Sequence, residues 1–224
     1  MEKELINDLY NTVTEKLKEL PFEDRTKDMY ASMKYPRFFP LMRFQTNAYY
    51  IKGFGSVMLM RTNAMNGMMK LLTVSFTPSE GLNIPYLLID CMEMKNKRLA
   101  YIEYYDCTEK SLKFETLSKI KEKYGSIPNY EEKPAWYIQE RMDGSMIKGG
   151  KGVEASKLSA MVSESIGEYF RLAQKADKDS DNLTGLKKMQ TRLLEEGNPS
   201  SGTMTKVLGK AEYVEFFKNY VMPV

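Results

Sequence analysis

The sequence contains no histidine, and only two of its 224 residues are cysteines. Without histidine there is no Ser-His-Asp triad, no Cys-His pair and no histidine-based metal site. Cys91 and Cys107 do not have metal-ligand spacing. No apolar run approaches the roughly 18 residues that indicate a membrane-spanning helix, and the start MEKELINDLY is acidic and amphipathic, unlike a signal peptide. We therefore expect a cytoplasmic protein with no bound metal and no membrane partner.

Net charge is also small. The 33 basic and 30 acidic side chains leave +3, which is too mild and too evenly spread to indicate a nucleic-acid partner. The 42% hydrophobic and 28% charged content is typical of a soluble globular protein. Methionine (17) and tyrosine (15) are unusually frequent. They suit a soft pocket for a flat, polarizable ligand, but methionine-rich cores are commoner than methionine-rich pockets, so composition alone does not indicate a binding site.

The order of sequence patterns predicts one domain over residues 1–224. An N-terminal helix and arm occupy 1–40, a sheet meander 41–106, a helix and an irregular loop 107–152, and C-terminal helices 153–224. The segment 125–152 is the least regular and is a candidate lid or binding loop. Helices are predicted, from apolar residues at helical spacing and from the stops that follow, at 2–20, 111–124, 153–176, 182–196 and 203–221, the last with a break at Gly209.

The middle of the chain changes to a strand pattern. Strands are predicted at 41–51, 56–62, 68–77, 86–92 and 99–106. The links between them are too short for crossover helices, so the strands should pair antiparallel. The expected fold is α+β, a three-layer α/β/α sandwich in which helices cover a central antiparallel sheet.

Asp90 interrupts the apolar strand 86–92. A carboxylate is costly to bury while charged, so such a group usually has a raised pKa or a partner. Asp90 is therefore the leading candidate for a functional residue. The alternative is a structural role, as an ion pair with Arg61 or as a backbone-bonded carboxylate at a strand end.

The spacing around Asp90 resembles that of the ferredoxin-dependent bilin reductases. The matching residues are Leu71, Leu72, Val74, Phe76, Pro78, Pro85 and Asp90. Near the C-terminus the chain offers Asn198-Pro199, a helix at 203–208, Gly209 and the aromatic-rich segment 213–220, which follow the family's second signature. The resemblance covers roughly 40–106 and 165–224.

The resemblance implies reduction of a linear tetrapyrrole without a bound metal or flavin, with electrons from an acidic ferredoxin-type partner and Asp90 as proton donor. It also implies substrate binding by Arg61 through a propionate, and by Thr73 and Asn198 through lactam oxygens or a water. Three positions depart from the family. Thr73 stands where several members have histidine, Arg61 near a position that is acidic in some members, and Asn198 in place of a second aspartate. Surface charge for Arg61, strand formation for Thr73 and helix capping for Asn198 are the simpler explanations of these three residues.

Three functions stay open: a bilin reductase, a non-catalytic member that binds a tetrapyrrole or another planar ligand, and an interaction protein that has lost the pocket. The cluster Lys95, Lys97 and Arg98 suits an acidic redox partner, although a solvated hairpin tip explains it too. The segment 149–152, Gly-Gly-Lys-Gly, has no preceding strand in the predicted pattern, and we expect a flexible loop there.

Overall fold

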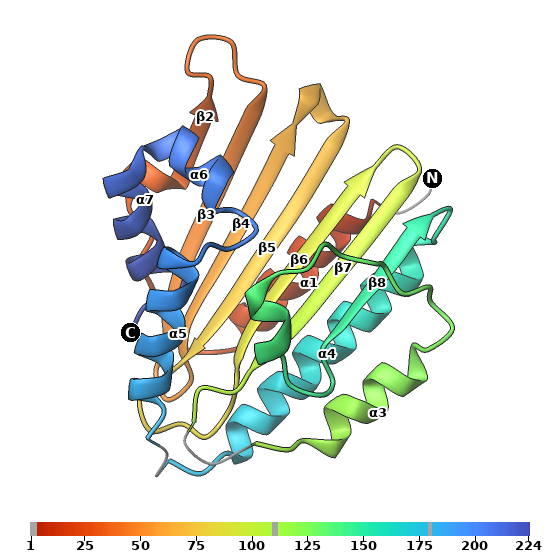
Figure 1. Cartoon of the computed structure of the whole chain (residues 1–224), viewed down its shortest axis with the longest axis vertical. Helices are drawn as coiled ribbons and strands as arrows, with labels where there is room; N and C mark the ends of the chain where they lie inside the picture. Colours follow the sequence, from red (N-terminus) through yellow and green to blue (C-terminus); the bar gives the residue numbers. More distant parts are fainter. Residues whose placement is uncertain (1–3, 109–111, 179–180) are drawn as a thin grey trace.

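A computed structural model describes residues 4–108, 112–178 and 181–224 of the chain. Its centre is an eight-stranded antiparallel sheet with the order β1-β3-β4-β5-β6-β7-β8, and β2 pairs with β3 beside β1. One face carries α1 and α4, and the other carries α5, α6 and α7 (Figure 1). The predicted α/β/α sandwich with a central antiparallel sheet is confirmed.

The strands are β1 (Phe22–Asp24), β2 (Ser32–Tyr35), β3 (Met42–Ile51), β4 (Gly55–Ala64), β5 (Met69–Pro78), β6 (Tyr86–Met94), β7 (Lys97–Tyr105) and β8 (Met146–Lys151). The helices are α1 (Leu5–Lys18), α2 (Asp28–Ala31), α3 (Glu115–Lys123), α4 (Ala155–Lys175), α5 (Leu183–Glu195), α6 (Ser201–Leu208) and α7 (Lys210–Phe216). Short irregular helical turns lie at Met65–Gly67, Trp136–Glu140 and Phe217–Val221. All five predicted strands are present.

Strand alternation divides the core into two halves. On β6, Leu87, Ile89 and Cys91 belong to the cluster beneath α1 and α4. Tyr86 belongs to the cluster beneath α5 and α7, and Asp90 projects to that same face because strand side chains alternate. Because helices cover both faces of the sheet, most side chains of β6 are apolar. On the face beneath the C-terminal helices, Asp90 is the exception.

Two segments differ from the sequence prediction. The connection at 21–40 contains β1 and β2, which extend the sheet edge and are too short to give a periodic signal. Segment 149–152 is largely part of β8, so the predicted flexible loop is wrong. A Cβ on Gly149 would lie 2.1 Å from the Arg98 carbonyl oxygen, so only glycine fits where β8 meets β7. Glycine is uncommon in strands, so the glycines that allow this pairing also remove the strand pattern from the sequence.

The C-terminal helices match the predicted ranges closely. The predicted break at Gly209 is present, with φ +84° between α6 and α7. The predicted start of the helix at 111 lies outside the described residues, and α3 begins at Glu115. Within the described ranges, none of the helices combines the length and the apolar character that crossing a bilayer requires.

Candidate functional site

A cavity of about 510 Å³ lies between the sheet and the C-terminal layer. Its walls come from β3 to β7, from the segment 130–141 and from the start of α6. Five methionines line it, a soft and polarizable wall for a flat ligand: Met42, Met60, Met69, Met92 and Met204. Volumes of this size are typical of small-molecule sites.

Asp90 lines this cavity from the middle of β6. The residue is half-buried, and Thr73, its direct partner on β5, donates a hydrogen bond from Oγ1 to the Asp90 carboxylate. Burial raises the pKa of Asp90, while the Thr73 hydrogen bond acts in the opposite direction. The carboxyl group therefore holds its proton more readily than an exposed aspartate does.

A narrower hollow of about 40 Å³ shares Asp90 and Thr73 with the main cavity and extends toward α5 and α7. Asn198 lines this extension. However, its Nδ2 donates to the Leu193 carbonyl (2.9 Å) and to the Tyr213 hydroxyl (2.6 Å), and its Oδ1 accepts from the Ser200 backbone (3.1 Å). The side chain is thus close to Asp90 but engaged in holding the turn before α6.

Arg61 is not brought to this cavity. Its guanidinium lies over the Tyr10 ring at 4.0 Å, and its Nη2 donates to Gln45 Oε1 at 2.6 Å. Because Tyr10 belongs to α1, Arg61 points to the face of the sheet opposite Asp90. The structure therefore gives no support to Arg61 as an ion-pair partner of Asp90 or as a group in the Asp90 cavity.

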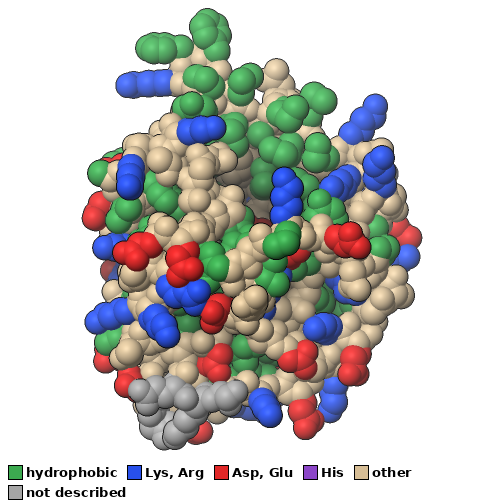
Figure 2. All heavy atoms as spheres, viewed as in Figure 1, with side chains coloured by type: hydrophobic (Ala, Val, Ile, Leu, Met, Phe, Trp, Pro, Cys, Tyr) green, Lys and Arg blue, Asp and Glu red, His purple; other side chains and the backbone are tan. Residues whose placement is uncertain are grey.

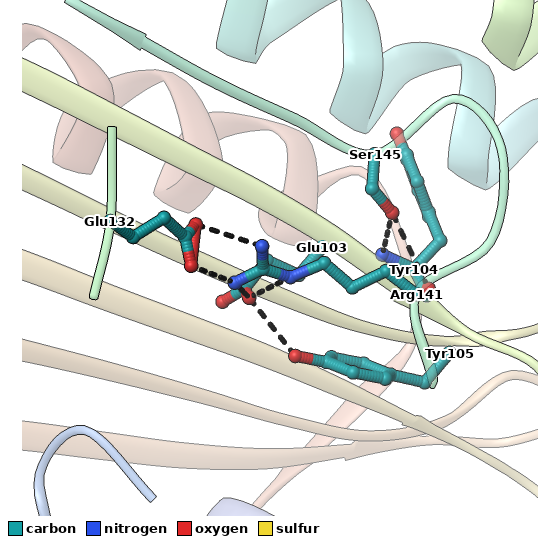
Figure 3. A network of polar contacts seen from close by, with 6 residues as sticks. All are labelled: Glu103, Tyr104, Tyr105, Glu132, Arg141 and Ser145. Carbon is teal, nitrogen blue, oxygen red and sulfur yellow. Dashed lines mark hydrogen bonds and ion pairs between the residues drawn. The ribbon is translucent and has the colours of Figure 1, made fainter. Parts of the chain in front are cut away.

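A buried ion network forms the other polar wall, and sequence reasoning missed it (Figure 3). Arg141 donates from Nε to Glu103 on β7 (2.6 Å) and makes a two-bond contact with Glu132 (2.8 and 2.9 Å). Tyr105 also donates from its hydroxyl to Glu103, at 3.0 Å. Glu103 is 2% exposed, yet it lines the cavity together with Arg141 and Glu132.

Burial raises the pKa of Glu103 to about 7, with Arg141 lowering it and the nearby Asp90 carboxylate raising it further. The cavity thus contains a second carboxyl group that can be protonated near neutral pH. A signal was present in the sequence, because Glu103 interrupts the apolar strand β7 much as Asp90 interrupts β6. Its partner Arg141 lies in an irregular segment, where no pattern could have placed it.

The predicted binding loop also contributes. Tyr130, Glu132, Lys133 and Tyr137 line the cavity from the segment before β8. Trp136 instead turns toward the C-terminal layer, where its Nε1 donates to the Gly197 carbonyl at 2.9 Å. The loop therefore forms a wall of the cavity while its tryptophan anchors it to the neighbouring layer.

The resemblance to the ferredoxin-dependent bilin reductases is confirmed at the level of the fold. In particular, the chain is similar to phytochromobilin synthase from tomato, solved in complex with biliverdin, with a TM-score of 0.76. The match covers 96% of this chain and 81% of that chain, at 9% sequence identity. No protein-family model and no curated protein sequence matches the chain.

Proposed function

We propose that the protein binds a linear tetrapyrrole in the 510 Å³ cavity and reduces it with electrons from ferredoxin, with Asp90 as proton donor. The observation that carries this proposal is the position of Asp90. A half-buried carboxyl group with a raised pKa faces a methionine-lined cavity, in a fold shared with a protein solved with biliverdin.

The chemistry requires protons as well as electrons. Reduction of one double bond of a tetrapyrrole consumes two electrons and two protons, and the ligand itself accepts the electrons. Protonated Asp90 donates one proton to the reduced ligand and accepts pyrrole N–H hydrogen bonds once it is ionised. Glu103, with a pKa of about 7 in the same cavity, is a second group that can supply or restore a proton.

The charges of the lining also favour one orientation of the ligand. The acids Asp90, Glu103 and Glu132 match the N–H groups of a tetrapyrrole, which are hydrogen-bond donors. Arg141 is already bonded to two of these acids. The propionates are therefore best placed toward Lys133, an exposed cation at the cavity rim.

The test begins with biliverdin. Titration of the purified protein should give a red-shifted, sharpened absorbance band, and reduced ferredoxin without oxygen should then convert that band. Asp90→Asn should keep the bound band and lower turnover by about 10²–10⁴, the usual contribution of a positioned proton donor. Glu93→Gln serves as a matched control, because Glu93 is on the same strand but forms an ion pair with Arg98 (2.8 Å) outside the cavity. Unchanged conversion by Asp90→Asn would remove Asp90 as the donor.

A non-catalytic tetrapyrrole binder is the second candidate, and Asn198 is the observation that favours it. The family's second aspartate is replaced by an amide, which cannot supply a proton at neutral pH. Here its side chain is also committed to Leu193 and Tyr213. A stable biliverdin band that reduced ferredoxin leaves unchanged would establish this function instead.

A further inference from the structure

A second hollow, of about 390 Å³, lies near the start of α1 and beside the tips of the hairpins. We call it the basic groove. Its described lining consists of Ile6, Asn7, Ser32, Lys34, Arg43, Phe44, Gln45, Arg61, Thr62, Asn63 and Lys70. Every charged side chain in this set is a cation. The groove therefore differs sharply from the acid-lined cavity around Asp90.

The sheet register arranges these side chains in rows. Lys34 on β2 pairs with Arg43 on β3, Arg43 with Asn63 on β4, and Asn63 with Lys70 on β5. Paired residues project to the same face, so the four side chains form one row across four strands. With strands about 4.8 Å apart, the row extends roughly 14 Å. That length suits a ligand with more than one anionic group.

At the β2 end of the row, Lys34 and Arg43 lie opposite each other with no acidic partner among the described residues. Like charges directly opposite on adjacent strands destabilise a sheet, and Lys34 and Arg43 are such a pair. At the other end, Lys70 pairs with Glu4 at 2.7 Å, while Glu93 opposite it is engaged by Arg98. Within the described residues, neither Lys34 nor Arg43 forms an ion pair. A bound anion would relieve their repulsion.

We propose that the basic groove binds a phosphate-bearing anion, held chiefly by Arg43 and Lys34. Guanidinium presents a planar set of donors that matches phosphate oxygens, and ammonium adds a mobile point charge. Arg61 supports the site by holding Gln45 Oε1, which leaves the amide nitrogen of Gln45 as a further donor. The proposal is independent of tetrapyrrole chemistry, since Asp90 does not line this groove.

The neighbouring loops suggest two sources for the phosphate. Phe38 and Phe39, at the tip between β2 and β3, are 87% and 85% exposed. Met65, between β4 and β5, is 51% exposed and donates its backbone N–H to the Leu41 carbonyl at 2.8 Å, which joins the two tips. Figure 2 shows hydrophobic side chains gathered at this end of the molecule. The phosphate is thus carried either by a soluble compound or by a lipid headgroup beside these apolar tips.

The test measures pyrophosphate binding by calorimetry and by thermal shift at low ionic strength. Wild type should bind saturably, and Arg43→Gln and Lys34→Gln should each weaken binding at least tenfold. Lys187→Gln is the matched control, since Lys187 is exposed on α5 in the C-terminal layer, and it should bind as wild type does. No saturable binding, or equal binding by Arg43→Gln and wild type, would overturn the proposal.

A second arm uses vesicles of phosphatidylcholine with and without phosphatidylglycerol. Binding only to the anionic vesicles, weakened both by Arg43→Gln and by Phe38→Ser with Phe39→Ser, would identify a lipid headgroup as the source. Pyrophosphate binding without vesicle binding would identify a soluble phosphate compound. Far-ultraviolet circular dichroism recorded on every variant shows that each one is folded whether or not the protein binds biliverdin, so a failure here is separable from a failure of the tetrapyrrole proposal.

Discussion

The two faces of the central sheet differ in how completely they are packed. Beneath α1 and α4, the described core consists of aliphatic and aromatic side chains such as Val74, Leu87 and Ile89, all fully buried. Beneath the C-terminal helices, the same strands present Thr73, Asp90 and Glu103 around an open cavity. The comparison indicates that the close-packed face beneath α1 and α4 provides most of the stability. The face beneath the C-terminal helices is less stabilising because it holds charged groups and a cavity.

A matched pair on β6 tests this contrast with the largest expected effect on stability. Leu87 is fully buried beneath α1 and α4, whereas its neighbour Leu88 is half-buried and lines the narrow extension of the cavity. Leu87→Ala should lower the free energy of unfolding by about 2–5 kcal/mol, because it opens a new void in a close-packed core. Leu88→Ala should cost clearly less, because it enlarges a hollow that already exists.

Urea unfolding followed by circular dichroism measures both variants. The two substitutions remove the same atoms from adjacent positions, so the difference between them reports the packing of the two faces. Equal losses for Leu87→Ala and Leu88→Ala would contradict the distinction between a closed face and an open one.

The sequence predicted the packing better than it predicted the polar wall. Strand alternation and turn residues were sufficient to locate β3 to β7 and the break at Gly209, because these are local properties. Asp90 was recognisable because an acid in an apolar strand is costly to bury. The face of a strand on which Arg61 lies depends on register, which a one-residue shift inverts. Residue spacing alone therefore could not show that Arg61 lies outside the Asp90 cavity.

The Arg141 network shows a second limit of prediction from sequence, which concerns contacts between distant segments. Glu103 gave the same local signal as Asp90, but its partner Arg141 is separated from it by α3 and by an irregular segment. Long-range ion pairs of this kind leave no periodicity in a sequence. Gly149 illustrates the converse, since a backbone requirement at the β7 contact removed the strand signal altogether.

The buried acids predict the next largest effect, a pH dependence of stability. The pKa of Glu103 is raised from 4.5 to about 7 in the folded state, so folded protein binds this proton more tightly than unfolded protein. Its ionisation therefore costs stability progressively as pH rises from about 4.5 to about 7. Glu103→Gln removes that cost, and wild type should lose roughly 3 kcal/mol relative to the variant across this range.

Thermal and urea unfolding of both proteins at several pH values measures the difference. Glu164→Gln is the control. Glu164 lies on α4, and hydrogen bonds from Lys123 and Tyr124 lower its pKa. Stability from a lowered pKa is lost as pH falls, so that variant should show a small change of opposite sign. A pH-independent difference between wild type and Glu103→Gln would show that folding does not raise the pKa of Glu103.

The smallest expected effect is on biliverdin affinity, and it compares two cations that lie on opposite sides of this contrast. Arg61 stacks on Tyr10 away from the cavity, whereas Lys133 lines its rim. Arg61→Gln and Lys133→Gln each remove one positive charge, so their effects on the overall field of the protein are matched. Arg61→Gln should leave biliverdin affinity within about twofold of wild type. Lys133→Gln should weaken it about two- to fivefold, the range of an exposed ion pair.

Biliverdin dimethyl ester separates the charge contact from general packing. The ester has no propionate charge, so its affinity should be the same for wild type and Lys133→Gln. Absorbance titrations of the acid and the ester against the three proteins complete the comparison. A larger loss for Arg61→Gln than for Lys133→Gln would reverse the assignment of the two faces, because a ligand carboxylate would then have to reach the α1 side of the sheet.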